Sequence, residues 1–230
     1  MKVVVFGATG MVGRGVLREC LLDPSVSAVV TVVRRATGVA DPKLAELVRP
    51  SVADLSGLVG PLTGLDACFF CLGVSVLGKS EAEYTRTTYD LTLAVASTLA
   101  GWNPGRLTFV YVSGAGTDSS ERGPRVWARV KGRTENALAR LPFRAVYFFR
   151  PGAIQPRHGI HSNTLAYRIV YAILWPFLPL LLRVAPGSTT TTDRVGRAMI
   201  AVARGGVPGP IVDTRAINRL GRDTAGAPSR

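Results

Sequence analysis

Near its start the chain contains Val3-Val-Val-Phe6-Gly7-Ala-Thr-Gly10-Met-Val-Gly13, a short apolar run followed by three closely spaced glycines. In a strand–turn–helix unit of this kind, the first glycine permits a sharp turn. The second lets the backbone approach a pyrophosphate, and the third lets helix and strand pack closely. Free N–H groups at the helix start and the helix dipole then attract phosphate. The sequence therefore predicts a dinucleotide-binding βαβ unit, with an ordinary strand–helix turn as the alternative.

Length and composition favour one globular domain. The chain has 230 residues, of which 47% are hydrophobic, enough for a sizeable core around a buried parallel sheet. It has three cysteines, and its first twenty residues contain the glycine motif rather than a secretory leader. Both features favour a reducing compartment, and we expect a cytoplasmic protein.

The formal net charge is +13, and nearly all of the cations are arginines. Such a charge raises the question of nucleic-acid binding. The arginines are spread along the chain, however, and no helix-turn-helix, zinc-finger or RNA-binding signature accompanies them. We therefore expect no specific nucleic-acid partner, although weak attraction to polyanions follows from the charge alone.

Apolar runs alternate with longer helical patterns through the first 150 residues. Helices are predicted at residues 11–22, 81–100 and 126–140, with a turn at 101–105. Strands are predicted at residues 3–6, 28–33, 44–49, 66–72, 107–112 and 144–149. Strict alternation implies right-handed crossovers and a parallel sheet. The predicted fold class is α/β: a doubly wound, Rossmann-like parallel sheet of about seven strands, forming a single domain over residues 1–220.

The pattern changes after Pro151. Residues 155–190 are predicted to form a small apolar helical cap over the cleft, because residues 169–182 carry no charge. That segment contains two prolines and is shorter than the ~20 residues of a membrane span. A weak membrane-surface contact or a dimer surface is the alternative, and the chain is expected to be a monomer or a homodimer. An amphipathic helix at 189–204, a strand near 210–213 and a frayed tail at 221–230 follow.

Several short motifs occur after the predicted strands, in a fixed order. They are Gly7-Ala-Thr-Gly-Met-Val-Gly13, Cys71-Leu-Gly73, Tyr111-Val-Ser113-Gly-Ala115, Trp127-Ala-Arg-Val-Lys131-Gly132 and Arg150-Pro-Gly152. With this order and spacing, residues 1–205 resemble the short-chain dehydrogenase/reductase superfamily, in its atypical single-domain branch. Within that branch the chain is similar to NmrA-like and Tat-interacting oxidoreductase-like proteins, of the NAD-dependent epimerase/dehydratase type.

The resemblance implies a nicotinamide dinucleotide. The cofactor-binding positions would be Gly7, Thr9, Gly10, Met11, Val12, Gly13, Arg34, Arg35, Asp54, Leu55, Cys71, Leu72, Gly73, Ser113, Lys131, Pro151, Gly152 and Ile154. The second strand ends in two arginines, where folds that prefer NAD(H) usually place a carboxylate. Guanidinium groups can bind a 2′-phosphate bidentately, so NADP(H) is expected rather than NAD(H). The alternative is that both arginines occupy an exposed strand end.

In the resembled family, Asp54 and its neighbour lie against the adenine, and Cys71-Leu-Gly73 runs beside the nicotinamide ribose. Asp54 could equally cap a following short helix. Cys68 and Cys71 form a C-x-x-C pair, but residues three apart on a strand point to opposite faces. Core packing is favoured for both cysteines, and no metal site is expected there. The two histidines, His158 and His161, lack carboxylate partners at catalytic spacing, so they are assigned no metal.

The resemblance also implies a catalytic pair, Ser113 and Lys131. In the family, a tyrosine four residues before the lysine exchanges the proton, the lysine lowers its pKa and holds the cofactor ribose, and the serine binds the substrate carbonyl. This chain has Trp127 at the tyrosine position, and an indole N–H donates a hydrogen bond but does not titrate usefully. Tyr84 and Tyr89 are candidate replacement donors, or else they pack at a helix surface.

Two functions are consistent with this pattern. The first is an NADP(H)-dependent oxidoreductase that acts on an apolar small molecule. The second is a catalytically weak NADP(H)-binding redox sensor or scaffold, which would explain the missing tyrosine without a replacement donor.

Overall fold

The computed structural model describes residues 1–160 and 187–222. Its main sheet has seven strands in the order β3-β2-β1-β4-β5-β6-β9, and every neighbouring pair is parallel. The strands are β1 Lys2–Phe6, β2 Ala28–Val33, β3 Leu44–Val48, β4 Ala67–Phe70, β5 Thr108–Val112, β6 Ala145–Arg150 and β9 Ile211–Asp213. The predicted doubly wound parallel sheet is confirmed. The strand order reverses between β1 and β4, and ligands of open α/β sheets bind at the carboxyl ends of strands at such a point.

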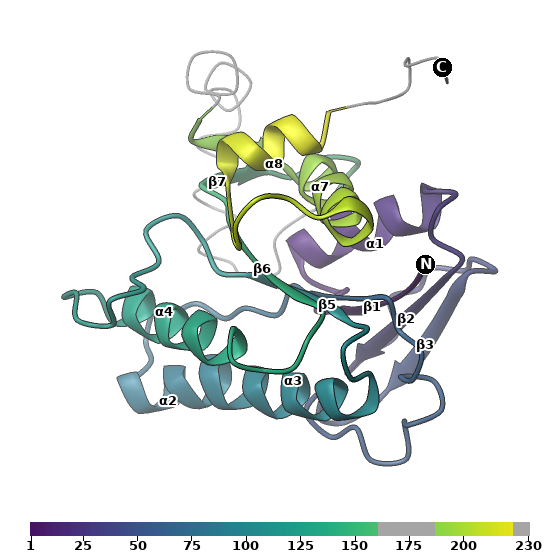
Figure 1. Ribbon diagram of the computed structural model, residues 1–230, viewed down its shortest axis with the longest axis horizontal. Coiled ribbons are helices and arrows are strands. Elements are labelled where there is room, and N and C mark those ends of the chain that lie inside the picture. The colour runs from purple at the N-terminus through teal and green to yellow at the C-terminus, as the bar shows by residue number, and fades with distance from the viewer. Residues whose placement is uncertain (161–186, 223–230) are drawn as a thin grey trace.

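Helices cover both faces of this sheet (Figure 1). One face carries α1 Met11–Leu22, α7 Thr192–Gly205 and α8 Thr214–Leu220. The opposite face carries α2 Glu81–Thr85, the π-helical turn η1 Arg86–Asp90, α3 Leu91–Trp102 and α4 Val126–Leu138. The predicted helix 81–100 thus contains one wide turn and extends two residues further, into the predicted turn at 101–105. Single π-helical turns are frequent near functional sites.

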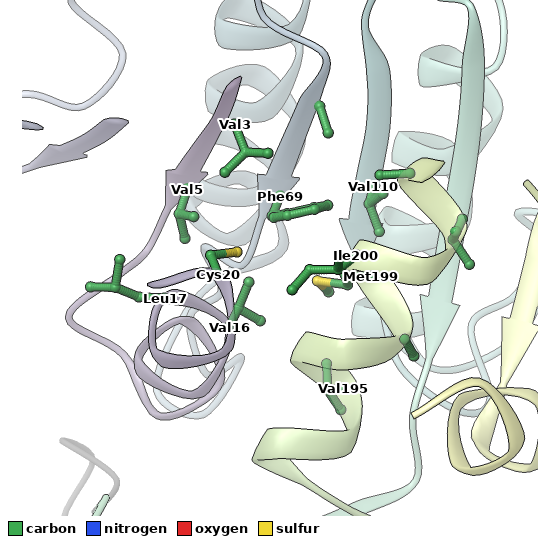
Figure 2. Close-up of a cluster of buried hydrophobic side chains, with 14 of the residues drawn as sticks. Val3, Val5, Val16, Leu17, Cys20, Phe69, Val110, Val195, Met199 and Ile200 are labelled. Atoms are coloured by element: carbon green, nitrogen blue, oxygen red, sulfur yellow. The ribbon is translucent and has the colours of Figure 1, made fainter. Parts of the chain in front are cut away.

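Alternating residues of the strands pack into two separate hydrophobic cores, one on each face of the sheet. Val3 and Val5 of β1 face α1 and α7, whereas Val4 and Phe6 face α3 and α4. Figure 2 shows the first core, in which Val16 and Cys20 of α1 meet Met199 and Ile200 of α7 beside the sheet. Burying a valine or leucine contributes roughly 1.5–3 kcal/mol, so both faces of the central strands stabilise the fold. This explains the near-continuous apolar runs in the sequence.

The segment after β6 departs from the predicted pattern. Ala153–Gln155 forms β7, which pairs in parallel with β8, Thr189–Thr191. Helix α7 therefore begins at Thr192, three residues after the start predicted at residue 189. The three β-branched threonines favour a strand, and the side chain of Thr191 then caps α7 by accepting from the Arg194 N–H. Helix α8 was not predicted, although Asp213 caps it by accepting from Ala216 N, which is a recognisable start signal.

Two predictions lie wholly or partly outside the described residues. Residues 161–186, including His161 and the apolar segment 169–182, belong to the predicted cap, and residues 223–230 belong to the predicted tail.

Candidate functional site

The glycine-rich turn joins β1 to α1 at the sheet edge where the strand order reverses. Gly7 has φ +79°, and a Cβ there would lie 2.8 Å from the Cys71 carbonyl group on the neighbouring strand end. A Cβ on Gly13 would lie 2.0 Å from the Gly7 carbonyl oxygen. Only glycine fits these two positions, because the contacting atoms are backbone. The turn is therefore packed against β4 and closed on itself.

The start of α1 is open to an anion. Gly10 is its N-cap residue, no side chain caps the helix, and its first turn contains no acidic residue. Thr9, Gly10, Met11 and Val12 are all partly exposed. Unsatisfied N–H groups at this end and the helix dipole would favour a phosphate. These features fit the diphosphate of a dinucleotide.

Beside the turn lies a hollow of about 600 Å³ lined by Thr9, Arg14, Arg34, Arg35 and Ala36. All three arginines are exposed, and no salt bridge in residues 1–160 and 187–222 involves them. The lining contains three cations and no carboxylate. Sequence reasoning missed Arg14, although its place directly after Gly13 put it one residue from the predicted phosphate cradle.

Asp54 and Leu55 follow β3. The Asp54 side chain is exposed and accepts from the N–H and hydroxyl of Ser56, and these hydrogen bonds lower the pKa of its carboxyl. These hydrogen bonds close a turn. Because no helix follows this turn, Asp54 does not cap a helix. Leu55 is buried in the core facing α3 and α4, which leaves its backbone for any ligand contact.

Cys71, Leu72 and Gly73 follow β4 next to the glycine-rich turn. Cys71 N donates to Phe6 O, and Gly73 is exposed with no atom within 4 Å of a Cβ built on it. Cys68 packs in the core beneath α3, whereas Cys71 packs in the core beneath α1, so their side chains lie on opposite faces as predicted. Burial raises the pKa of both thiols, that of Cys71 to about 12, which makes them poor nucleophiles.

The residues that the resemblance assigned to catalysis come together where the end of β5 meets the first half of α4. Lys131 Nζ donates to the Ser113 carbonyl oxygen. Ser113 is buried, and its N–H and hydroxyl both donate to the Phe149 carbonyl on β6, at 2.9 and 3.3 Å. Trp127 lies against the loop that follows Ser113, since a Cβ on Gly116 would sit 3.4 Å from its ring.

Lys131 is in an unusual environment for a lysine. Burial lowers its pKa to about 8, and the negative charge of Glu135 partly opposes that shift. At neutral pH the ammonium group is therefore mostly charged, but it loses its proton within the mildly alkaline range.

Tyr84 is only 2% exposed and lies in the core near Tyr111, whose pKa is raised by burial and by the nearby Tyr84. This burial favours packing over proton donation for Tyr84. Tyr89 is half-buried beneath Arg133, whose guanidinium carbon lies 4.4 Å from the ring centroid. Neither tyrosine projects freely from its helix.

The Arg150-Pro-Gly152 motif lies at the end of β6. Pro151 O accepts from Ala115 N, which joins this segment to the loop after Ser113. A Cβ on Gly152 would lie 2.1 Å from the Ser188 carbonyl oxygen, so the chain passes closely under β8. Ile154 is 8% exposed, and its side chain packs inward.

No family model matches the chain. Among curated proteins, it is 26% identical over 229 residues to the mitochondrial protein fmp52-2 of Aspergillus oryzae, covering 95% of this chain and 96% of that one. It is 30% identical over 159 residues to the mitochondrial protein fmp52-1 of Aspergillus terreus, covering 66% of each chain.

Solved structures share the fold. MoeE5, in complex with UDP-glucose and NAD, matches with a TM-score of 0.64 and 21% identity, covering 92% of this chain and 74% of that one. The UDP-glucose 4-epimerase of Thermotoga maritima matches with a TM-score of 0.61 and 16% identity, covering 89% and 74%. The fold is thus of the Rossmann type, shared with this epimerase, with a dTDP-glucose 4,6-dehydratase in complex with NAD and with a short-chain dehydrogenase family protein.

The cytoplasmic prediction is contradicted by the curated relatives, which are named mitochondrial proteins. A low cysteine count favours a reducing over an oxidising compartment, but it does not separate the cytosol from an organelle. Within the described residues, no helix combines the length and apolarity that a membrane crossing needs.

Proposed function

We propose that the protein binds NADP(H) along the carboxyl edge of β1, β2 and β4. The observation that carries this proposal is the hollow lined by Arg14, Arg34 and Arg35 beside the open start of α1. Three guanidinium groups suit a 2′-phosphate, whereas a ribose without that phosphate is usually held by a carboxylate. NAD in the MoeE5 complex supports a nicotinamide cofactor for this fold.

The proposed activity is oxidoreduction of an apolar small molecule, as in the atypical short-chain dehydrogenase/reductases that the motifs resemble. When bound, the nicotinamide would supply a hydride. Lys131 would hold ribose hydroxyls through its ammonium group, and the Ser113 region would border the substrate. Val74 and Leu77, which follow the Cys71-Leu-Gly73 segment, are 43% and 72% exposed and could offer an apolar contact to the substrate.

The second candidate is a catalytically weak NADP(H)-binding regulator. Two observations favour it. Trp127 replaces the usual proton donor, and the Ser113 hydroxyl donates to the Phe149 carbonyl rather than standing free. Oxidation of NADPH by a panel of quinones and hydrophobic carbonyls distinguishes the two candidates. Turnover of any of them supports the enzyme, and binding without turnover supports the regulator.

Cofactor preference is tested by calorimetric titration of NADP⁺ and NAD⁺. The wild type should bind NADP⁺ more tightly. The Arg34→Ala/Arg35→Ala variant should lose about 2–4 kcal/mol of NADP⁺ affinity, because two charge-assisted contacts are removed with partial compensation. Arg106→Ala is the control, since this exposed arginine pairs with Asp66 near the opposite end of the sheet. Equal wild-type affinity for both cofactors would contradict the proposal.

A further inference from the structure

A buried ion pair joins α4 to the end of β6 and has no part in the proposed function so far. Glu135 is 1% exposed, and its carboxylate binds Arg150 through both oxygens: Nε lies 3.1 Å from Oε1, and Nη2 contacts Oε2. Burying a carboxylate is costly unless a partner of good geometry offsets the loss of hydration. The bidentate guanidinium meets that requirement.

This pair lies next to the candidate reaction site. Glu135 is four residues after Lys131 on α4, so both side chains lie on one face of the helix. Arg150 directly follows Phe149, whose carbonyl accepts both hydrogen bonds from Ser113. Arg150 Nη2 also donates to Ser119 Oγ at 2.6 Å, in the loop between β5 and α4. One guanidinium therefore fixes a helix, a strand end and a loop around Lys131.

Other ionisable groups pack near this part of α4, but they are engaged elsewhere. Arg129 pairs with Glu81 of α2, and Arg133 covers Tyr89 of η1. Tyr84 of α2 and Tyr111 of β5 present buried hydroxyl groups. Among the described residues, Glu135 is the group whose negative charge raises the pKa of Lys131, and it opposes the lowering caused by burial.

We propose that Glu135, fixed by Arg150, is a positioning residue that keeps the Lys131 ammonium charged and directed to the Ser113 carbonyl. The inference rests on the proposed function only in assigning Lys131 to the cofactor. Without the carboxylate, the partly buried ammonium of Lys131 would lose its proton at a lower pH, and the neutral amine would have one N–H fewer to donate.

The first test needs no cofactor. The chain has four lysines, so its lysine side-chain NMR signals can be followed individually in the full-length protein labelled at lysine, with Lys131→Met assigning the relevant one. The wild-type Lys131 signal should titrate near pH 8. In Glu135→Gln the midpoint should fall by about one pH unit, and Glu135→Asp, which keeps the charge, should stay closer to wild type.

Two controls separate charge from packing. Glu81→Gln removes the partner of Arg129 on the outside of α2 and should leave the Lys131 midpoint unchanged. Should Glu135→Gln not fold, Glu135→Gln/Arg150→Met removes both buried charges and should still lower the midpoint, because the charge that acts on Lys131 is that of Glu135. Coincident titrations of wild type and Glu135→Gln, or equal shifts in the Gln and Asp variants, would overturn the inference.

The second test measures NADP⁺ affinity against pH. Affinity of the wild type should decline above about pH 8, and that of Glu135→Gln should decline from about one unit lower. A wild type that binds neither NADP⁺ nor NAD⁺ contradicts the proposed function, while the NMR midpoints still decide the inference. Binding by both proteins with superimposable pH profiles contradicts the inference and leaves the proposed function intact.

Discussion

The two ends of the candidate functional site differ in how many hydrogen bonds and ion pairs their side chains already form within the protein. At the end beside β2, Arg14, Arg34 and Arg35 are exposed and form no salt bridge in the part of the chain that the structure describes. At the end beside β5 and β6, Lys131 and Arg150 are held by hydrogen bonds to Ser113, Glu135 and Ser119. The first end is an open cationic hollow, and the second is a polar network centred on the buried residues Ser113 and Glu135.

This difference suggests two ways of binding. Exposed arginines can reorient toward a phosphate, but each loses side-chain freedom when it binds, so they add moderate affinity. The buried network has already lost that freedom during folding, and its low-polarity surroundings strengthen each charge interaction. Substitutions at the open end should therefore change affinity alone, whereas substitutions at the buried end should change chemistry, pH dependence or stability.

The largest expected effect is at Trp127. Trp127→Tyr should raise reduction of hydrophobic aldehydes and ketones by up to ~10²–10⁴, the usual contribution of a positioned general acid. Lys131 and Ser113 already stand at the matching positions. NADPH oxidation monitored by absorbance measures the gain, and adding Lys131→Met should abolish it. Brisk ketone reduction by the wild type that survives Ser113→Ala and Lys131→Met would mean that the chemistry lies elsewhere.

The next effect concerns the glycine-rich turn between the two ends. Gly13→Ala should lower the free energy of unfolding by about 1–3 kcal/mol, because the new methyl group would lie 2.0 Å from the Gly7 carbonyl oxygen. Urea denaturation measures the change. Gly73→Ala is the matched control, since no atom lies within 4 Å of its Cβ position. Equal stability of the two variants would show that the turn relaxes more easily than its geometry indicates.

A smaller effect is expected at Arg14, the residue that sequence analysis missed. Arg14→Ala should weaken NADP⁺ binding by about 1.5 kcal/mol, close to tenfold, and should affect NAD⁺ less, because the lost contact is to the 2′-phosphate. Paired titrations measure the difference, and folding should be unchanged because the side chain is exposed. An equal loss for both cofactors would assign Arg14 to the diphosphate instead.

The smallest effect concerns the loop between β5 and α4. Asp118 accepts from Ser120 N, Ser120 Oγ and Gly123 N, and these hydrogen bonds lower the pKa of its carboxyl below 3.8. A folded-state pKa below the unfolded one stabilises the protein above about pH 4, and the benefit is lost as the pH falls through the folded-state value. The Asp118→Asn variant should therefore have a lower free energy of unfolding than the wild type at pH 6, and this difference should shrink toward pH 3. A gap that persists at pH 3 would point to packing rather than charge.

Local patterns predicted much of the fold. The apolar runs and glycine spacing located α1 and β2 to the residue and β1 to within one residue, because a doubly buried parallel strand needs an uninterrupted apolar run. Opposite-facing Cys68 and Cys71 followed from the period of a strand. The motif order predicted the Rossmann architecture, and the arginine pair after β2 lines the hollow beside the glycine-rich turn.

The sequence by itself therefore determined the order of the elements and the positions at which only glycine fits. The tertiary structure decided which side chains meet. The pairing of Glu135 with Arg150, the burial of Tyr84 and the contribution of Arg14 to the arginine hollow depend on contacts between elements far apart in the chain. No local period or propensity encodes such contacts, because they arise only when the sheet brings the ends of its strands together.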